Sequence, residues 1–150
     1  MQARRIKAAR VNGHTLVEVL VVLAIMAVLA AAAMQGWQAL VRRQQRIEGK
    51  AALLDAMQQQ ERHLSRHGRY RPFDAAAPGP FKWHSGPTPA QSAYSISAVA
   101  CAGVSMGPCV TVLAHPSGPG VKPDQGDLAC GVLRLDSRGM QQADGGASCW

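Results

Sequence analysis

The stretch GHTLVEVLVVLAIMAVLA, residues 13–30, places one carboxylate, Glu18, in an otherwise apolar run. Apart from this residue, the chain is continuously apolar from Leu16 to Met34. At about 1.5 Å per residue, a helix of roughly 19 residues is about 28 Å long, which is close to the thickness of the hydrocarbon core of a bilayer. The stretch therefore predicts a membrane-crossing helix with one charge near its start.

The residues before this run are basic and include no acid. The four cations there are Arg4, Arg5, Lys7 and Arg10. Because cations that flank a span favour the cytoplasmic side, we expect a cytoplasmic N-terminus. Without these four cations the net charge falls from +7 to +3, which leaves little basic excess. Nucleic acid is a possible partner, but the sequence does not support it, because no basic patch with interleaved aromatic residues is visible.

The helical pattern continues past Gly36. Its periodic apolar residues are Leu40, Ile47, Ala51, Leu54, Met57 and Leu64. This spacing predicts an amphipathic helix, and Gly68 followed by Pro72 predicts its end. The whole helix, from Leu16 to His67, would be far longer than the average helix of a globular protein. This length predicts a rod-like shaft.

The remaining chain predicts a small antiparallel sheet after a long loop. Residues 68–93 are rich in proline, with Phe81 and Trp83 as candidate anchors. The strand signals are Tyr94–Ala100, Cys109–Ala114 and the apolar residues Val132, Leu133 and Leu135, before a turn at residues 136–139. We expect the tail, residues 141–150, to be flexible unless Cys149 is bonded. The fold class is therefore α+β.

All four cysteines lie in the last third of the chain: Cys101, Cys109, Cys130 and Cys149. An even number of cysteines in a small domain that follows an export-like segment predicts disulfides in an oxidising compartment. Four cysteines allow three pairings, and the spacing favours Cys101 with Cys109 and Cys130 with Cys149. The cysteines lack the close pairs that preorganise zinc sites.

The sequence predicts no catalytic, cofactor-binding or metal site. His63 and His67 are four residues apart and could share a helix face, but no third ligand stands at a recognisable spacing, so we expect surface histidines. Serine, histidine and aspartate residues are scattered without the local context of a nucleophile site. The chain carries no glycine-rich phosphate-binding loop. We therefore expect a protein that is not an enzyme and needs no cofactor.

The opening stretch resembles the class III signal of type IV prepilins, in which a short basic leader ends in glycine and an apolar helix begins with Thr-Leu-x-Glu. The matching residues are Gly13, Thr15, Leu16 and Glu18. The resemblance implies that a prepilin peptidase cuts between Gly13 and His14, removes a leader of residues 1–13 and methylates the new amino group of His14. It also implies that Glu18 pairs with the amine of a neighbouring subunit and so guides subunit assembly.

The resemblance extends to PilE-type minor pilins over roughly residues 8–72 and 128–150. It implies the type IV pilin fold, with a transmembrane and filament-core helix at 14–37 and a head domain at 38–150. Within the head we expect an amphipathic helix at 38–67, a loop at 68–93, and a sheet with a disulfide-stapled tail at 94–150.

The implied function is that of a structural minor subunit of a type IV pilus, serving pilus assembly, twitching motility, adhesion or DNA uptake. The implied partners are other pilins, through the N-terminal helix, and the prepilin peptidase. Before assembly the chain would be a single-pass protein of the inner membrane with a periplasmic head, and afterwards part of an extracellular pilus. Two alternatives stay open: a pseudopilin of type II secretion, and a membrane-anchored adhesin or DNA-binding receptor.

Overall fold

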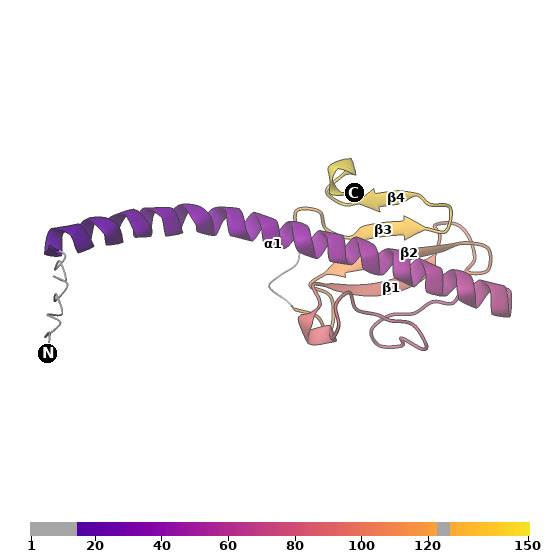
Figure 1. Cartoon of the computed structure of the whole chain (residues 1–150). Coiled ribbons are helices and arrows are strands. Elements are labelled where there is room, and N and C mark those ends of the chain that lie inside the picture. The colour runs from indigo at the N-terminus through magenta and orange to yellow at the C-terminus, as the bar shows by residue number, and fades with distance from the viewer. Residues whose placement is uncertain (1–14, 123–126) are drawn as a thin grey trace, which may run out of the picture. The chain divides into compact units, whose positions relative to one another are not determined.

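The computed structural model describes residues 15–122 and 127–150 (Figure 1). The predicted leader, the cleavage position at Gly13 and His14, and the methylation position at His14 lie outside the described residues. The chain divides into two units, Met1–Gln38 and Ala39–Trp150, which we describe separately.

One helix, α1, spans Leu16–His67 and takes part in both units. It starts behind Thr15, whose hydroxyl oxygen accepts a hydrogen bond from the Glu18 backbone N–H at 3.3 Å. It ends at Gly68, which adopts φ 71° and donates its N–H to the carbonyl of Leu64 at 2.7 Å. This is the glycine stop that the sequence predicts.

The first unit exposes a continuous apolar surface. Every side chain described from Leu16 to Ala33 is exposed, and the most apolar window of α1 has a mean hydropathy of 2.8. Among the described residues, α1 is the one helix long and apolar enough to cross a membrane.

The second unit contains a four-stranded antiparallel sheet that one face of α1 covers (Figure 1). Its strands are β1 (Tyr94–Ala100), β2 (Val110–Pro116), β3 (Leu133–Asp136) and β4 (Gln141–Ala143), in the spatial order of the sequence. The predicted fold class, a long helix packed on a small antiparallel sheet, is confirmed. The sequence missed β4, which lies in the segment expected to be flexible unless Cys149 is bonded.

The face of α1 that packs on the sheet agrees only in part with the predicted one, of which Met57 and Leu64 are partly buried against the core. Leu40, Ile47 and Leu54 are 58%, 56% and 52% exposed. The buried helix residues are instead Gln45, Gly49, Leu53, Ala56 and Gln60. Small residues allow the helix to approach the sheet closely, and a Cβ added at Gly49 would lie 2.9 Å from the Tyr94 ring. Leu40, Ile47 and Leu54 therefore form a surface that the single chain leaves open.

The loop between α1 and β1 is tied to the free edge of β1. Isolated bridges join Phe73 to Ala98 and His84 to Ser95. Phe81 is 6% exposed and belongs to the core, and Trp83 packs against the core, as the sequence predicts for these two anchors.

Two disulfides join Cys101 to Cys109 and Cys130 to Cys149. This is the pairing that the spacing favours. The second disulfide fixes the tail, where the indole N–H of Trp150 donates to the carbonyl of Gln142 at 2.6 Å. The Lys50 ammonium lies 5.6 Å from the centre of the Trp150 ring, so Trp150 packs on the head rather than projecting from it.

Candidate functional site

Four exposed arginines gather where α1 ends, and we call them the arginine cluster. They are Arg62 and Arg66 in the last turns of the helix, and Arg69 and Arg71 in the segment that follows. Within the part of the chain that the structure describes, none of the four forms an ion pair with a carboxylate. The cluster therefore presents unneutralised positive charge to solvent.

Buried polar contacts fix the segment that carries Arg69 and Arg71. The Gln60 side chain is fully buried. Its amide donates to the carbonyl of Arg71 at 2.6 Å and its oxygen accepts from the Arg71 N–H at 3.0 Å. The neighbouring Tyr70 is buried, and its hydroxyl donates to Glu61 at 2.7 Å. These bonds hold the chain against α1 directly after the turn at Gly68, so both pairs of arginines lie on one end of the head.

Two shallow hollows adjoin the cluster and share His63 and His67 in their walls. One has a volume of about 440 Å³ and is lined by Arg62, Arg66 and Phe81. The other has a volume of about 390 Å³ and is lined by Arg69, Arg71 and residues that include Met106. The site therefore combines guanidinium groups with the imidazole rings of the two histidines, and the guanidinium groups suit the binding of anionic groups.

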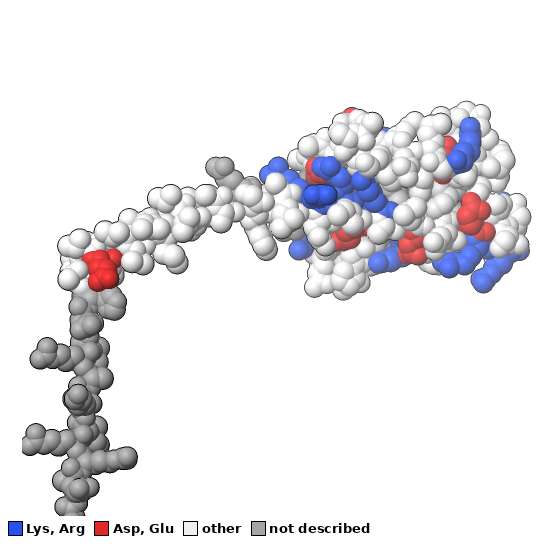
Figure 2. Space-filling view, turned by 45° about the horizontal axis from the view of Figure 1, so that its top comes forward, with Lys and Arg blue, Asp and Glu red and all other residues white. Residues whose placement is uncertain are grey.

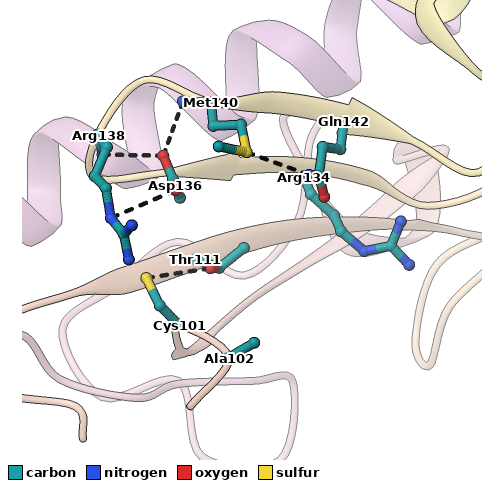
Figure 3. Close-up of a pocket in the computed structure, with 8 residues that line it drawn as sticks. All are labelled: Cys101, Ala102, Thr111, Arg134, Asp136, Arg138, Met140 and Gln142. Carbon is teal, nitrogen blue, oxygen red and sulfur yellow. Dashed lines mark hydrogen bonds and ion pairs between the residues drawn. The ribbon is translucent and has the colours of Figure 1, made fainter. Parts of the chain in front are cut away.

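A second group of arginines lies on the sheet face away from α1, around a hollow of about 260 Å³ (Figure 3). Each of these arginines has a carboxylate partner. Arg134 pairs with Asp144 at 2.5 Å, and Arg138 lies 4.0 Å from Asp136. The hydrogen bond from Arg134, helped by one from the Val132 N–H, lowers the pKa of the Asp144 carboxyl below its usual range. The positive charges of these two arginines are thus largely neutralised.

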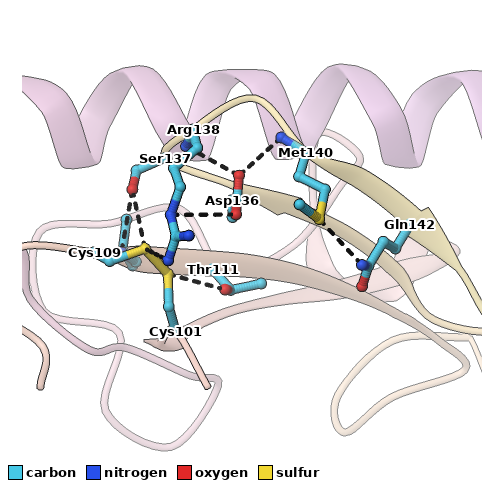
Figure 4. A network of polar contacts seen from close by, with 9 residues as sticks. Cys101, Cys109, Thr111, Asp136, Ser137, Arg138, Met140 and Gln142 are labelled. Carbon is cyan, nitrogen blue, oxygen red and sulfur yellow. Dashed lines mark hydrogen bonds and ion pairs between the residues drawn. A yellow bond between two sulfur atoms is a disulfide. The ribbon is translucent and has the colours of Figure 1, made fainter. Parts of the chain in front are cut away.

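The Cys101–Cys109 disulfide borders the same hollow (Figure 4). The guanidinium of Arg138 lies 3.5 Å from Sγ of Cys109, and the hydroxyl of Ser137 lies 3.4 Å from it. Asp136 is close to both sulfurs, but because they are bonded to each other they offer no thiolate to a metal ion.

A third basic group lies on α1 near the start of the second unit. It consists of Arg42, Arg43, Arg46 and Lys50. Arg46 pairs with the buried Asp127 at 2.6 Å. Partial burial, followed by repulsion from Arg46, lowers the pKa of the Lys50 ammonium. Figure 2 shows Lys and Arg side chains in several separate places on one face of the head, rather than in one patch.

Of the sequence-predicted site residues, the structure joins the four cysteines in two disulfides. Glu18 is exposed in the first turn of α1, in the first unit, whereas both disulfides belong to the second. The sequence interpretation missed the arginine cluster because it weighed the net charge rather than the position of each charge. The signal was present in ERHLSRHGRYR, residues 61–71, which contains all four arginines.

A long N-terminal helix on a four-stranded antiparallel sheet, with a disulfide-bonded C-terminal region, defines a type IV pilin. The prokaryotic N-terminal methylation motif matches residues 9–34. The family model of the type IV minor pilin ComP, DNA uptake sequence receptor, matches residues 36–134, which is more than half of the chain. The chain belongs to this family, and its role is that of a minor subunit of a type IV pilus.

A solved type IV pilin from Shewanella oneidensis is similar to this chain at 24% sequence identity and a TM-score of 0.44, covering 73% of this chain and 97% of the pilin. No curated protein sequence matches the chain. The pilin family and fold are structural rather than enzymatic. The family match favours a pilus subunit over the pseudopilin alternative.

Proposed function

We propose that this minor pilin binds duplex DNA at the arginine cluster and thereby contributes to DNA uptake. The observation that carries the proposal is the match to the family of DNA uptake sequence receptors. The cluster is the surface of the head best suited to phosphate groups, because its arginines are exposed and have no carboxylate partner among the described residues.

The charge balance near the cluster supports this assignment. Residues 62–82 contain four arginines and Lys82 against a single acid, Asp74. The Asp74 carboxylate accepts hydrogen bonds from the N–H groups of Ala76 and Ala77 at 2.9 and 2.8 Å. Arginine contacts to phosphate supply affinity by releasing counterions, and they position a protein on the duplex without reading its sequence.

The test is fluorescence anisotropy of a labelled duplex with the full mature chain in detergent micelles, over a range of salt concentrations. For Arg62→Ala/Arg66→Ala we expect weaker binding. If both arginines contact phosphate, the slope of log K against log[salt] should decrease in magnitude by about 2. The matched control is Arg42→Ala/Arg43→Ala, which removes the same charge elsewhere on α1. Equal losses in both variants, or no loss in the first, would contradict the assignment to the arginine cluster.

We propose that processing and membrane anchoring of the chain follow the domain boundaries predicted from the sequence. A prepilin peptidase would remove residues 1–13, and residues 14–37 would anchor the chain in the inner membrane with the head, residues 38–150, in the periplasm. The exposed apolar surface from Leu16 to Ala33 supports an anchor of this kind. Intact mass spectrometry tests the proposal, since a chain that begins at N-methylated His14 is expected, and a chain that begins at Met1 would contradict it.

We propose that the part of α1 in the head domain also contacts other pilins. Leu40, Ile47 and Leu54 recur every seven residues and are all more than half exposed. A stripe with this spacing on an open helix face suits packing against another helix. Substituting Ile47 with Asp should reduce recovery of the chain in sheared pili, whereas Gln58→Asp on a polar exposed position serves as the control.

A further inference from the structure

The Cys101–Cys109 disulfide closes a loop whose ends the sheet already holds together. Strands β1 and β2 pair along their whole length, and the last pair, Ala100 with Val110, directly adjoins the two cysteines. The Cys101 N–H also donates to the carbonyl of Cys109 at 3.5 Å. The two strands therefore do not depend on the covalent bond for their register, and the two sulfurs stay close to each other if the bond opens.

The two cysteines of this disulfide have different surroundings. Both are buried, but Cys101 lines the hollow of about 260 Å³ on the sheet face away from α1, whereas Cys109 does not (Figure 3). Sγ of Cys109 instead accepts hydrogen bonds from the Arg138 guanidinium at 3.5 Å and from the Ser137 hydroxyl at 3.4 Å (Figure 4). An incoming group can thus reach Cys101, while donors surround the sulfur of Cys109.

The donors at Cys109 stabilise a thiolate more than they stabilise the disulfide. A disulfide sulfur is a weak neutral acceptor, whereas a thiolate is charged, and hydrogen bonds to charged groups are the stronger ones. A neighbouring guanidinium also favours a thiolate. The Asp136 carboxylate is close to both sulfurs and opposes this effect, but it accepts hydrogen bonds from the backbone N–H groups of Arg138 and Met140 at 3.0 and 2.8 Å, which offset part of its charge.

We propose that the Cys101–Cys109 bond is a site of thiol–disulfide exchange with an external dithiol. A thiolate of the dithiol attacks Sγ of Cys101 and forms a new sulfur–sulfur bond there, while the Cys101–Cys109 bond breaks and its electron pair stays on Sγ of Cys109. The second thiolate of the dithiol then attacks the first sulfur of the dithiol and releases Cys101 as a thiolate. The dithiol loses two electrons and releases two protons to water, and the two cysteines gain the electrons and take up two protons.

The exchange acts on a loop that takes part in a second site. Met106 lies in this loop, packs against the core and lines the 390 Å³ hollow beside the arginine cluster. Opening the bond removes the covalent restraint on this wall of the hollow. The exchange itself does not depend on DNA binding.

The test is incubation of the full mature chain in detergent micelles with dithiothreitol, followed by alkylation of free thiols and peptide mass spectrometry. We expect Cys101 and Cys109 to be alkylated while the Cys130–Cys149 bond stays closed, because within residues 15–122 and 127–150 no side-chain donor contacts the sulfurs of that bond. With glutathione, a monothiol, the mixed disulfide should form at Cys101 and leave Cys109 as the alkylated thiol. The circular dichroism spectrum should stay native throughout.

Arg138→Gln should slow the reaction with dithiothreitol by about threefold or more, because Cys109 becomes a poorer leaving group. The matched control is Arg134→Gln, which removes the same charge from the wall of the same hollow, since Arg134 pairs with Asp144 rather than with a sulfur. This control should react like the unaltered chain. A loss of stability would speed the exchange, so a slower reaction of Arg138→Gln does not arise from misfolding.

Five outcomes would overturn the proposal. They are a Cys101–Cys109 bond that stays closed, a Cys130–Cys149 bond that opens first or at the same rate, addition of glutathione to Cys109, loss of the native spectrum on reduction, and equal rates for Arg138→Gln and Arg134→Gln.

Discussion

Tyr94 packs its ring on Gly49 in the centre of the head and is fully buried. Its hydroxyl has no hydrogen-bond partner among the described residues. Burial, followed by the nearby Asp127 carboxylate, raises the pKa of Tyr94 to about 12. A buried hydroxyl without a partner lowers the stability of a fold, because the group has lost its hydrogen bonds to water.

Removing this hydroxyl should therefore stabilise the head. We expect Tyr94→Phe to raise the free energy of unfolding by about 1 kcal/mol, as measured by urea denaturation followed by tryptophan fluorescence. Tyr70→Phe is the matched control, since it removes a hydroxyl that donates to Glu61 and should lower the same quantity. A clear loss of stability in Tyr94→Phe would show that the hydroxyl has a partner.

His115 should make the head less stable in acid. It lies on β2 with Nε2 3.2 Å from the Ser97 hydroxyl oxygen, and burial, followed by repulsion from Arg134, lowers its pKa. The unfolded chain, in which a histidine titrates near about 6.5, then binds the proton more readily than the folded chain. The free energy of unfolding should fall as the pH drops from 7.5 through this value toward the folded-state pKa.

The comparison variant for this pH effect is His115→Gln. Denaturation at pH 7.5 and pH 5.5 should show a smaller difference for the variant than for the unaltered chain, because glutamine does not titrate. Equal differences in the two proteins would assign the acid sensitivity to other groups.

At the scale of elements, the contact between α1 and the following loop depends on Gln60. This side chain bonds both backbone groups of Arg71. Gln60→Ala leaves that N–H and that carbonyl without their partner, so we expect a loss of about 1 to 3 kcal/mol in the free energy of unfolding. Gln58→Ala, on the exposed face of the same helix, should change it little. If the two variants lose equal stability, the buried contact with Arg71 is not what stabilises this part of the fold.

The disulfides stabilise the sheet and the tail to different extents. Cys130 and Cys149 are separated by 19 residues, and Cys101 and Cys109 by 8. The chain-entropy model gives about 3 kcal/mol for the longer loop and about 2.5 kcal/mol for the shorter one. We expect Cys130→Ala/Cys149→Ala to be the less stable double variant in urea denaturation. The reverse order would mean that native contacts in the loops, rather than loop closure, set the stabilisation.

For the whole molecule, Glu18 has two candidate roles. Its backbone N–H bonds the Thr15 hydroxyl at the start of α1, which places it at the position that glutamate or glutamine takes in a capping box. The proposed assembly role instead needs its negative charge, because a carboxylate among lipid tails costs about 2.5 to 3.5 kcal/mol and requires a partner.

Two substitutions separate these roles. Glu18→Ala should leave peptidase cleavage intact and reduce the amount of the chain recovered in sheared pili, measured by immunoblot against the membrane fraction. Glu18→Gln keeps the capping geometry but removes the charge, so the charge-pairing hypothesis predicts the same reduction. Normal incorporation of Glu18→Gln would leave helix capping as the role of this residue.

The sequence by itself determined the long helix, its stop at Gly68 and the bounds of β1, because apolar periodicity and glycine geometry act over a few residues. It also favoured the observed disulfide pairing, since short loops close at the lowest entropic cost.

The tertiary structure alone decided which face of α1 is buried. Hydropathy favoured Leu40, Ile47 and Leu54 as well as Met57 and Leu64. Only Met57 and Leu64 pack against the core, because Gly49 and Ala56 permit the closer approach of another face to the sheet. It also added β4, which contains only three residues and depends on pairing with β3 and on the Cys130–Cys149 bond. The same non-local packing places Met106 in one hollow with His63 and His67. No pattern of local spacing encodes such neighbours, because chain segments far apart in sequence meet only when the core forms.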